Sequence, residues 1–286
     1  MPNGIIRIDM TKLKFDLKCA GYCEADGSHA LRGTPKGVIP FYATFAYIHH
    51  PKHGHILFDT GYTQRFYEET KRFPFNIYAA ITKVYIRPDE YASHQMNIQG
   101  VSPEEVSYII VSHFHADHIG GLKDFPNATF ICTKSAYDDV RNRKGISALS
   151  KGFVPNLMPS DFESRSKFIE IENASVEDDS LGKLYDLFDD ESILLCALDG
   201  HAKGQIGALL ETEKGKVFLV ADGAWLKQNY TEYHLPNPIV RLFFDSWKDF
   251  KSSLMRIHLY HKRNPETIII PCHCRETFLE LTNQQK

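Results

Sequence analysis

The chain contains a short stretch that is rich in histidine, Ser112-His113-Phe114-His115-Ala116-Asp117-His118-Ile119-Gly120-Gly121. It places three imidazoles and one carboxylate within six residues and ends in two glycines. A single histidine in a loop usually satisfies only local hydrogen bonds, whereas three histidines and a carboxylate at this spacing make a set of metal ligands. We therefore interpret the stretch as a metal-binding motif.

The metal-binding motif follows residues 106–111, an apolar run that is typical of a buried strand. Its ligands then lie on a loop at the carboxyl end of that strand, where sheet enzymes place their chemistry. In an extended backbone His113 and His115 project their rings to the same side, so they can bind one metal ion. Asp117 and His118 follow after the chain turns, and they point to a second position about 3.5–4 Å away.

Three further predicted strands end beside residues of ligand type. Strands 193–198, 217–220 and 267–271 are followed by His201, Asp222 and His273. A fourth, shorter strand ends at Asp59, whose carboxylate could accept a hydrogen bond from the free N–H of a ligand histidine. The alternative for Asp59 is an Asx turn or a helix cap.

Two other groups of histidine and cysteine are not counted as ligands. His49, His50, His53 and His55 surround a Pro/Gly turn, which predicts a solvated hairpin tip. Cysteines 272 and 274 flank His273, and in an extended segment they point away from it. The six cysteines of the chain are too sparse for a disulfide framework, so we expect free thiols.

Composition narrows the class of protein. The 286 residues, 43% of them hydrophobic, can bury one large core or two modest ones. The net charge of −3 indicates neither nucleic acid nor an anionic membrane as a partner. No apolar window approaches the roughly 18 residues of a membrane span. We expect a cytoplasmic protein that acts on a small molecule.

Two segments have a less regular pattern. Residues 19–37 are rich in glycine and small polar residues, which predicts a loop. Residues 62–99 are rich in aromatic side chains. They could form a helical cap over the site, pack against the rest of the domain, or supply the face of a homodimer.

The order of these ligands along the chain resembles that of the metallo-β-lactamase superfamily, over essentially the whole sequence. The matching motifs are Phe58-Asp59-Thr60-Gly61, the HxHxDH cluster, Gly200-His201, Ala221-Asp222-Gly223 and His273. The resemblance implies an α/β (α+β) fold, namely a four-layer αβ/βα sandwich. It implies a single domain over residues 1–286 with an aromatic-rich insertion at 62–99.

The resemblance also implies two divalent metal ions. One would be bound by His113, His115 and His201, the second by Asp117, His118 and His273, and Asp222 would bridge both. Zinc is our first expectation, although iron, manganese and cobalt also suit such ligands. A water shared by the metals becomes hydroxide near neutral pH and attacks a carbonyl or phosphoryl centre. Asp117 could orient it or carry a proton, which makes Asp117 the candidate catalytic residue.

Within the superfamily, the chain resembles the N-acyl-homoserine lactonase-like group most. Those lactonases commonly place a tyrosine three residues after the bridging aspartate, and here that residue is Trp225. Tyr230 or Tyr233 could take the role of that tyrosine, or could pack in the core.

We therefore predict a dinuclear hydrolase of a small ester or lactone. The alternatives are a glyoxalase II-like thioesterase, a phosphodiesterase and a non-catalytic metal-binding scaffold. A mononuclear iron dioxygenase acting on persulfides also remains open within the superfamily.

Overall fold

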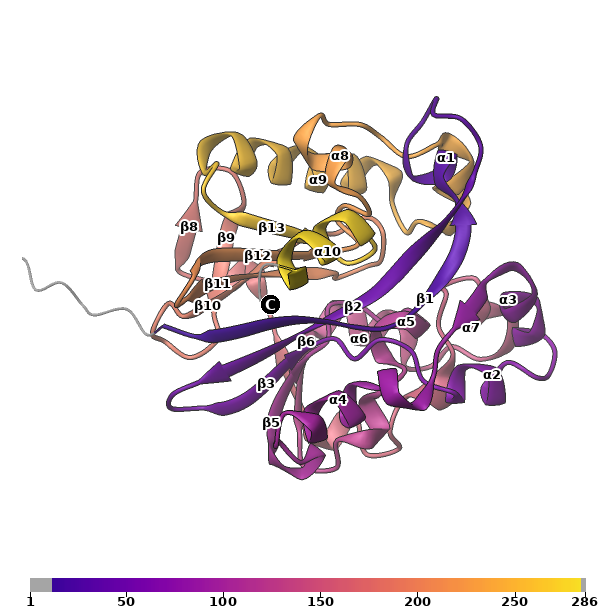
Figure 1. The fold of residues 1–286 in the computed structure, drawn as a ribbon, viewed down its shortest axis with the longest axis horizontal. Helices are drawn as coiled ribbons and strands as arrows, with labels where there is room; N and C mark the ends of the chain where they lie inside the picture. Colours follow the sequence, from indigo (N-terminus) through magenta and orange to yellow (C-terminus); the bar gives the residue numbers. More distant parts are fainter. Residues whose placement is uncertain (1–11, 284–286) are drawn as a thin grey trace, which may run out of the picture.

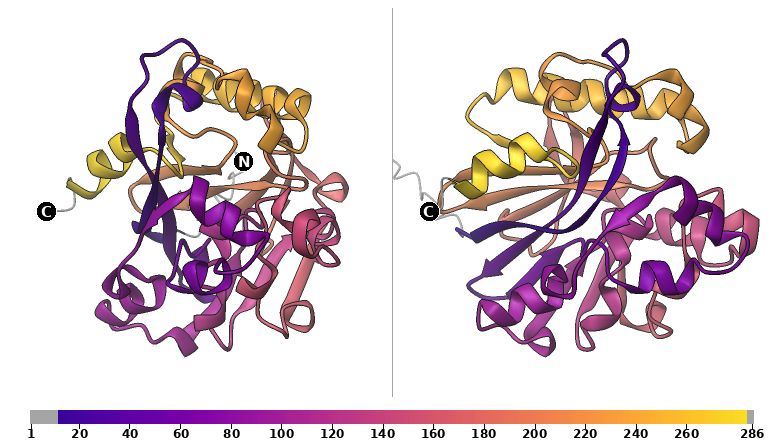
Figure 2. Two further views of the ribbon diagram at one scale, coloured as in Figure 1. Left: turned by 90° about the vertical axis from the view of Figure 1, so that its right-hand side faces the viewer. Right: turned by 45° about the vertical axis from the view of Figure 1, so that its right-hand side comes forward.

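The computed structural model describes residues 12–283, which form two mixed sheets that face each other (Figure 1). One sheet has seven strands in the order β4-β1-β2-β3-β5-β6-β7, and the other has six in the order β13-β12-β11-β10-β9-β8. Helices cover the outer face of each sheet (Figure 2). This arrangement confirms the predicted fold class.

The secondary-structure elements have the following bounds. The first sheet contains β1 (Lys14–Asp26), β2 (Val38–His50), β3 (Gly54–Phe58), β4 (Lys83–Tyr85), β5 (Val106–Ile110), β6 (Thr129–Thr133) and β7 (Ser166–Ile169). The second contains β8 (Val176–Asp178), β9 (Gly182–Asp186), β10 (Ile193–Ala197), β11 (Ile206–Thr212), β12 (Gly215–Ala221) and β13 (Ile268–Pro271). The α-helices are α1 (Gly27–Ala30), α2 (Arg65–Glu69), α3 (Phe75–Ile81), α4 (Ala92–Ile98), α5 (Ala116–Ile119), α6 (Lys134–Val140), α7 (Gly145–Leu149), α8 (Lys227–Thr231), α9 (Trp247–Arg263) and α10 (Arg275–Asn283). Short 3-10 helices are η1 (Pro88–Glu90), η2 (Pro103–Glu105), η3 (Leu122–Asp124), η4 (Pro155–Leu157), η5 (Glu163–Arg165), η6 (Ile171–Asn173) and η7 (Pro238–Phe243).

The central core lies between the two sheets. Ile48 and Ile110 of the first sheet share one buried apolar cluster with Leu195 and Leu219 of the second. Strands that are covered on one face alternate apolar and polar residues, whereas strands that are covered on both faces are continuously apolar. Burying both inner faces removes apolar surface from water and holds the sheets together.

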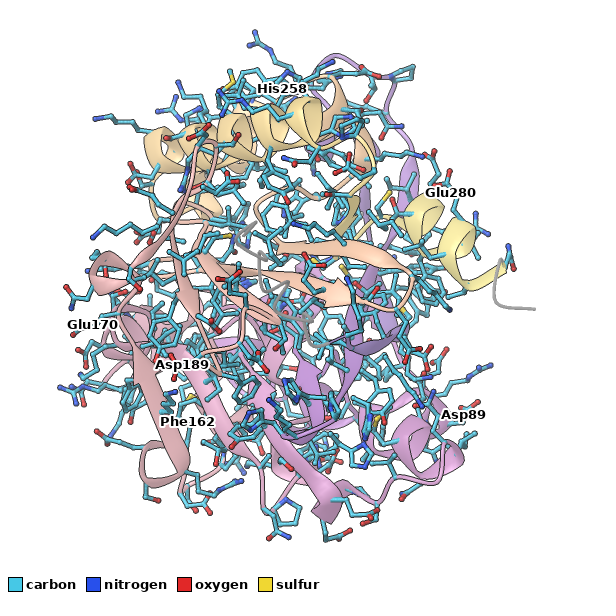
Figure 3. The ribbon with its side chains drawn as sticks, turned by 90° about the vertical axis from the view of Figure 1, so that its left-hand side faces the viewer. Asp89, Phe162, Glu170, Asp189, His258 and Glu280 are labelled. Atoms are coloured by element: carbon cyan, nitrogen blue, oxygen red, sulfur yellow. The ribbon has the colours of Figure 1, made fainter. Side chains whose placement is uncertain are left out.

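The longest helix, α9, covers the outer face of the six-stranded sheet. Its buried residues Phe250, Leu254 and Ile257 recur at three- and four-residue spacings, and Ser246 caps its first turn. Figure 3 labels His258 on α9, at the top of the view, and Glu280 on α10, a separate helix that contacts β1, β2 and β13. Within the described residues, every helix is too short or too polar to cross a membrane.

The strand directions bring the predicted ligands to one edge of each sheet. β3 and β5 are parallel neighbours, so Asp59 and the metal-binding motif follow strands that end at the same edge. β12 and β13 are also parallel, which brings Asp222 next to His273. β10 runs in the same direction as β12, because each is antiparallel to β11. The amide of Ile206 donates to the carbonyl of Ser112 at 3.0 Å and joins the two edges.

The loop predicted over residues 19–37 is partly wrong. β1 continues to Asp26 and pairs with β2 as far as Val38, with an irregularity between Cys19 and Tyr22. Gly21 adopts a φ of 79° at that irregularity, where a side chain would collide with the carbonyl of Tyr85. Long-range pairing therefore outweighed the local turn composition.

Candidate metal centre

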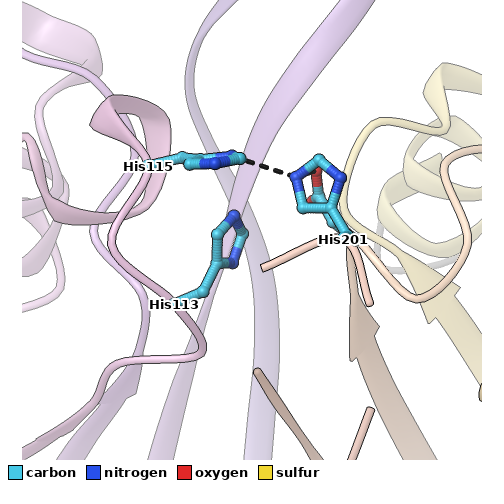
Figure 4. A group of neighbouring side chains, drawn as sticks. His113, His115 and His201 are labelled. Atoms are coloured by element: carbon cyan, nitrogen blue, oxygen red, sulfur yellow. Dashed lines mark hydrogen bonds and ion pairs between the residues drawn. The ribbon is translucent and has the colours of Figure 1, made fainter. Parts of the chain in front are cut away.

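Three imidazoles from two loops meet at the sheet edges. His113 and His115 lie between β5 and α5, and His201 lies after β10. Figure 4 shows the three rings turned toward one another, with His201 Nε2 2.9 Å from His115 Nδ1. Ligand atoms of these histidines and of Asp222 all lie within 4.8 Å of one another. We call these four residues the three-histidine group.

A second set of side chains lies on the other side of Asp222. It consists of His118 from α5, Asp222, Cys272 and His273, and their ligand atoms also lie within 4.8 Å of one another. His118 Nε2 is 3.3 Å from Asp222 Oδ1, and His273 Nε2 is 3.2 Å from Asp222 Oδ2. We call these four residues the thiol-containing group. Two clusters that share one carboxylate are consistent with a dinuclear metal site.

The expectation that Cys272 points away from the site is wrong. β13 ends at Pro271, and the chain then turns, with the amide of Cys274 donating to the carbonyl of Pro271 at 3.5 Å. The alternation of an extended segment no longer holds in a turn, so Cys272 and His273 both face the site. Cys272 Sγ donates to Asp222 Oδ1 at 2.7 Å. Cys274 instead packs into a small apolar cluster with Ala30.

The Asp222 carboxylate is almost fully buried and shared by both groups. His201 Nε2 is 2.9 Å from its Oδ2, and the indole nitrogen of Trp225 donates to the same oxygen at 3.0 Å. Burial opposes ionisation of Asp222, but His273 and His201 outweigh it and hold its pKa well below the usual range. Asp222 is therefore an anion that faces imidazoles on both sides.

Asp59 lies directly behind His118. Its Oδ2 is 2.7 Å from His118 Nδ1, and its two oxygens accept from the amide and the hydroxyl of Ser112 at 2.8 and 2.7 Å. Asp59 holds a left-handed backbone, with a φ of 60°, which turns the carboxylate toward these donors. His273 is fixed in a similar way, because its Nδ1 donates to the carbonyl of Tyr42 at 2.7 Å. Both rings therefore direct Nε2 into the thiol-containing group.

Asp117 lies beside the thiol-containing group. Its Oδ2 is 3.5 Å from His118 Nε2 and 3.7 Å from His273 Nε2. Its side chain also lines the cavity over the site. The carboxylate can therefore reach both the ligand atoms and a molecule bound in that cavity.

The donor atoms fit a metal. Three buried ring nitrogens make no hydrogen bond with any described residue: His113 Nε2, His118 Nε2 and His201 Nδ1. Buried polar atoms without a partner are costly and rare, so such a set in one place indicates a bound ion. Imidazole, carboxylate and thiol together are ligands of zinc and of neighbouring transition metals.

A cavity of about 630 Å³ opens over both groups. Its lining includes His115, His201, His273, Asp117 and Asp222, and its walls are mainly apolar. The aromatic-rich segment 62–99 supplies part of this wall, and it also packs against the first sheet through the buried Phe66. The apolar and aromatic side chains of the wall include Phe41, Tyr62, Ile77, Tyr78, Ile81, Leu149, Trp225, Leu242 and Phe243.

The two tyrosines considered for the pocket are placed elsewhere. The hydroxyl of Tyr230 donates to the carbonyl of Ile269 at 3.4 Å, and that of Tyr233 donates to the carbonyl of Lys251 at 3.3 Å. Both pack with α9 against the outer face of the second sheet, Tyr230 from α8 and Tyr233 from the segment after it. Trp225, in contrast, lines the cavity.

Sequence reasoning missed several residues around the site. Gly152 adopts a φ of 60°, and a side chain there would lie 2.7 Å from His115 Cδ2. Leu242 and Phe243 reach the cavity from η7, a segment with no regular pattern. Cys272 is also among them, because the sequence predicts an extended chain there, although its position next to His273 indicates the site.

The histidines of the hairpin between β2 and β3 are not all at a solvated tip. His50 is fully buried, and its Nε2 lies 3.1 Å from Ser192 Oγ and 3.2 Å from Asp190 Oδ2. Its Nδ1 accepts from the amides of Lys52 and His53. His50 therefore closes the turn and joins it to the second sheet.

The sequence is similar to those of known proteins. The sequence profile of the metallo-beta-lactamase superfamily matches residues 39–224. The N-acyl homoserine lactonase AttM of Azorhizobium caulinodans is 27% identical over 81% of this chain and 80% of its own length. The N-acyl homoserine lactonase of Bacillus cereus is 26% identical over 78% of this chain and 80% of its own length.

Solved structures share the fold over nearly the whole chain. An N-acyl homoserine lactone hydrolase, with the product N-hexanoyl-L-homoserine bound at its catalytic metal center, has a TM-score of 0.69 at 20% identity and covers 97% of both chains. AidC, a dizinc quorum-quenching lactonase, has a TM-score of 0.62 at 15% identity and covers 94% of this chain and 90% of its own.

Proposed function

Because the chain belongs to the metallo-beta-lactamase superfamily, we propose that it is a dinuclear metal-dependent hydrolase of a small ester or lactone. One observation carries the proposal: two groups of metal ligands share Asp222 at the floor of a largely apolar cavity. The N-acyl homoserine lactonases among its relatives favour a lactone with an acyl chain as the substrate.

We assign the metal ligands as follows. His113, His115 and His201 hold one ion, His118, His273 and Asp117 hold the other, and Asp222 is shared. Zinc is the proposed metal, with iron, manganese and cobalt as alternatives. Bound metals of this kind lower the pKa of a coordinated water and polarise a carbonyl oxygen.

The chain's own residues supply the remaining parts of the reaction. Asp117 lines the cavity next to the ligand atoms, so its carboxylate can take up a proton at Oδ2 and return it to the leaving oxygen. Asp59 keeps His118 in one orientation, and Trp225 holds the shared carboxylate in place.

The cavity walls select the substrate. Ile77, Ile81 and Leu242 present apolar surface around the opening, which suits an acyl chain better than a charged group. The indole N–H of Trp225 is already bonded to Asp222, so it is engaged when the substrate binds. The phenols in the wall are Tyr62 and Tyr78, and these are the candidates for contact with the substrate carbonyl.

The test is a substrate panel with metal-loaded protein. N-hexanoyl and N-decanoyl homoserine lactones, S-lactoylglutathione and bis-p-nitrophenyl phosphate are compared by kcat/KM, and products are identified by mass. We expect the lactones to be hydrolysed fastest. A preference for the glutathione thioester or for the phosphodiester would replace the proposal with one of those activities. Turnover of none of them by protein that carries two metals would favour a binding scaffold. The cytoplasmic location and the homodimer stay predictions from the sequence.

A further inference from the structure

The surroundings of Cys272 are unusual for a buried thiol. It is 5% exposed, and its sulfur lies 2.7 Å from Asp222 Oδ1, in the same group as His118 and His273. Among the cysteines within residues 12–283, it alone belongs to a cluster of potential metal ligands. Cys132 and Cys196 lie among apolar side chains, where a thiol simply fills space.

A second observation points to a ligand at the same place. His118 Nε2 is buried and makes no hydrogen bond in the described part of the chain, although the carboxylates of Asp222 and Asp117 lie 3.3 and 3.5 Å from it. The ring cannot turn away, because Asp59 holds its other nitrogen at 2.7 Å. His118 therefore directs Nε2 at the space that Cys272, Asp222 and His273 also face.

We propose that Cys272 is a thiolate ligand of the second metal ion, beside His118, Asp222 and His273. The proposal rests on the metal centre proposed above and adds one ligand to its assignment. When the sulfur–metal bond forms, the S–H bond breaks and its proton leaves to the solvent.

Asp117 keeps its assigned place at the second ion. Its Oδ2 lies 3.5 Å from His118 Nε2 and 3.7 Å from His273 Nε2, which are distances that two ligands of one ion also have. A thiolate also makes the second position softer than the first, so it prefers zinc or cobalt to manganese.

Cobalt spectroscopy tests the proposal without relying on activity. Metal-free protein is loaded with two equivalents of Co(II) under inert gas, and cobalt is counted by elemental analysis. We expect a sulfur-to-cobalt charge-transfer band in the near ultraviolet for the wild type and for Cys274→Ser, the matched control with a buried thiol two residues away. We expect Cys272→Ser to lose the band and to bind the second ion at least roughly tenfold more weakly.

The outcomes separate this proposal from the proposed function. Two bound cobalt ions without the charge-transfer band, or a band that survives in Cys272→Ser, would overturn the thiolate ligand and leave the metal centre intact. Failure of the wild type to bind cobalt or zinc would overturn the metal centre itself. If Cys272→Ser does not fold, X-ray absorption of the zinc-loaded wild type decides, since a thiolate requires a sulfur neighbour at about 2.3 Å.

Discussion

The three-histidine group and the thiol-containing group share Asp222, but the pKa values of two histidines in each group shift in opposite directions. Burial, followed by the neighbouring histidines, keeps the pKa of His113 and His115 well below the usual range. Burial acts in the same direction on His118 and His273, but nearby acids outweigh it and raise the pKa of both well above the usual range. These directions favour neutral rings at His113 and His115, which suit a cation, and protons at His118 and His273, which a cation must displace.

The difference has a local structural cause. His113 Nδ1 meets a neutral hydroxyl, that of Ser112, at 3.1 Å, whereas His118 Nδ1 meets the Asp59 carboxylate at 2.7 Å. The carboxylate of Asp117, which raises the pKa of His118 more than Asp59 does, lies 3.5 Å from the other ring nitrogen, Nε2, so a carboxylate stands at each end of the ring. Similar residues at one centre can therefore bind two ions with different proton release. Three substitutions and a pH series test this difference.

Asp117→Asn separates proton transfer from metal binding. The amide cannot take up the proton, so we expect kcat/KM to fall by roughly 100- to 10,000-fold. If Cys272 completes the second set of ligands, both metals remain, as elemental analysis will show. Asp138→Asn, on the exposed face of α6, is the matched control and keeps the rate. Loss of the second metal together with the rate would show that Asp117 acts through metal binding and not through proton transfer.

Asp59→Asn affects the thiol-containing group selectively. Without the carboxylate His118 loses its orienting partner, and we expect the second metal to bind about 10- to 100-fold more weakly while the first is retained. Competition with a chromogenic chelator measures the two affinities. Equal loss at both positions would show that Asp59 acts through Ser112 on the whole loop.

Gly152→Ala is the corresponding change at the three-histidine group. The added Cβ would lie 2.7 Å from His115 Cδ2, and the left-handed backbone costs about 1 kcal/mol more for alanine. We expect about tenfold weaker binding of the first metal, measured by the same competition. Gly145→Ala is the control, since it has a similar φ of 53° and no atom near the new Cβ. A matching loss in that control would assign the effect to the backbone alone.

The pH dependence of the metal-free protein should have opposite signs at the two groups. The raised pKa of His118 and His273 contributes stability that is complete below pH 6.5 and is lost as the pH rises through the folded-state pKa. The lowered pKa of His113 and His115 contributes stability that is present above pH 6.5 and is lost as the pH falls. Each histidine changes the free energy of unfolding by at most about 1.4 kcal/mol per pH unit.

Urea unfolding of metal-free variants checks these signs between pH 5 and 9. We expect His118→Gln to flatten the loss of stability on the alkaline side and His113→Gln to flatten it on the acid side. Identical profiles for the two variants would remove the distinction between the groups.

The contacts between side chains across the site depend on long-range packing and could not be predicted from the sequence. Whether Cys272 faces Asp222 depends on the turn after Pro271, and the contact between Trp225 and Asp222 depends on the path of the chain after β12. Tyr230 and Tyr233 pack against α9, and their orientation depends on how α8 and the segment after it meet α9. None of these contacts leaves a periodic pattern in the sequence.

The sequence by itself determined the class of fold and the identity of the candidate ligands. His113, His115, Asp117 and His118 lie within one short segment after a strand, so their proximity follows from local geometry. His201, Asp222 and His273 each follow a strand, and strands that run in one direction end at a common edge. Which side chains line the cavity depends on long-range packing, because turns and close approaches between distant parts of the chain place those side chains.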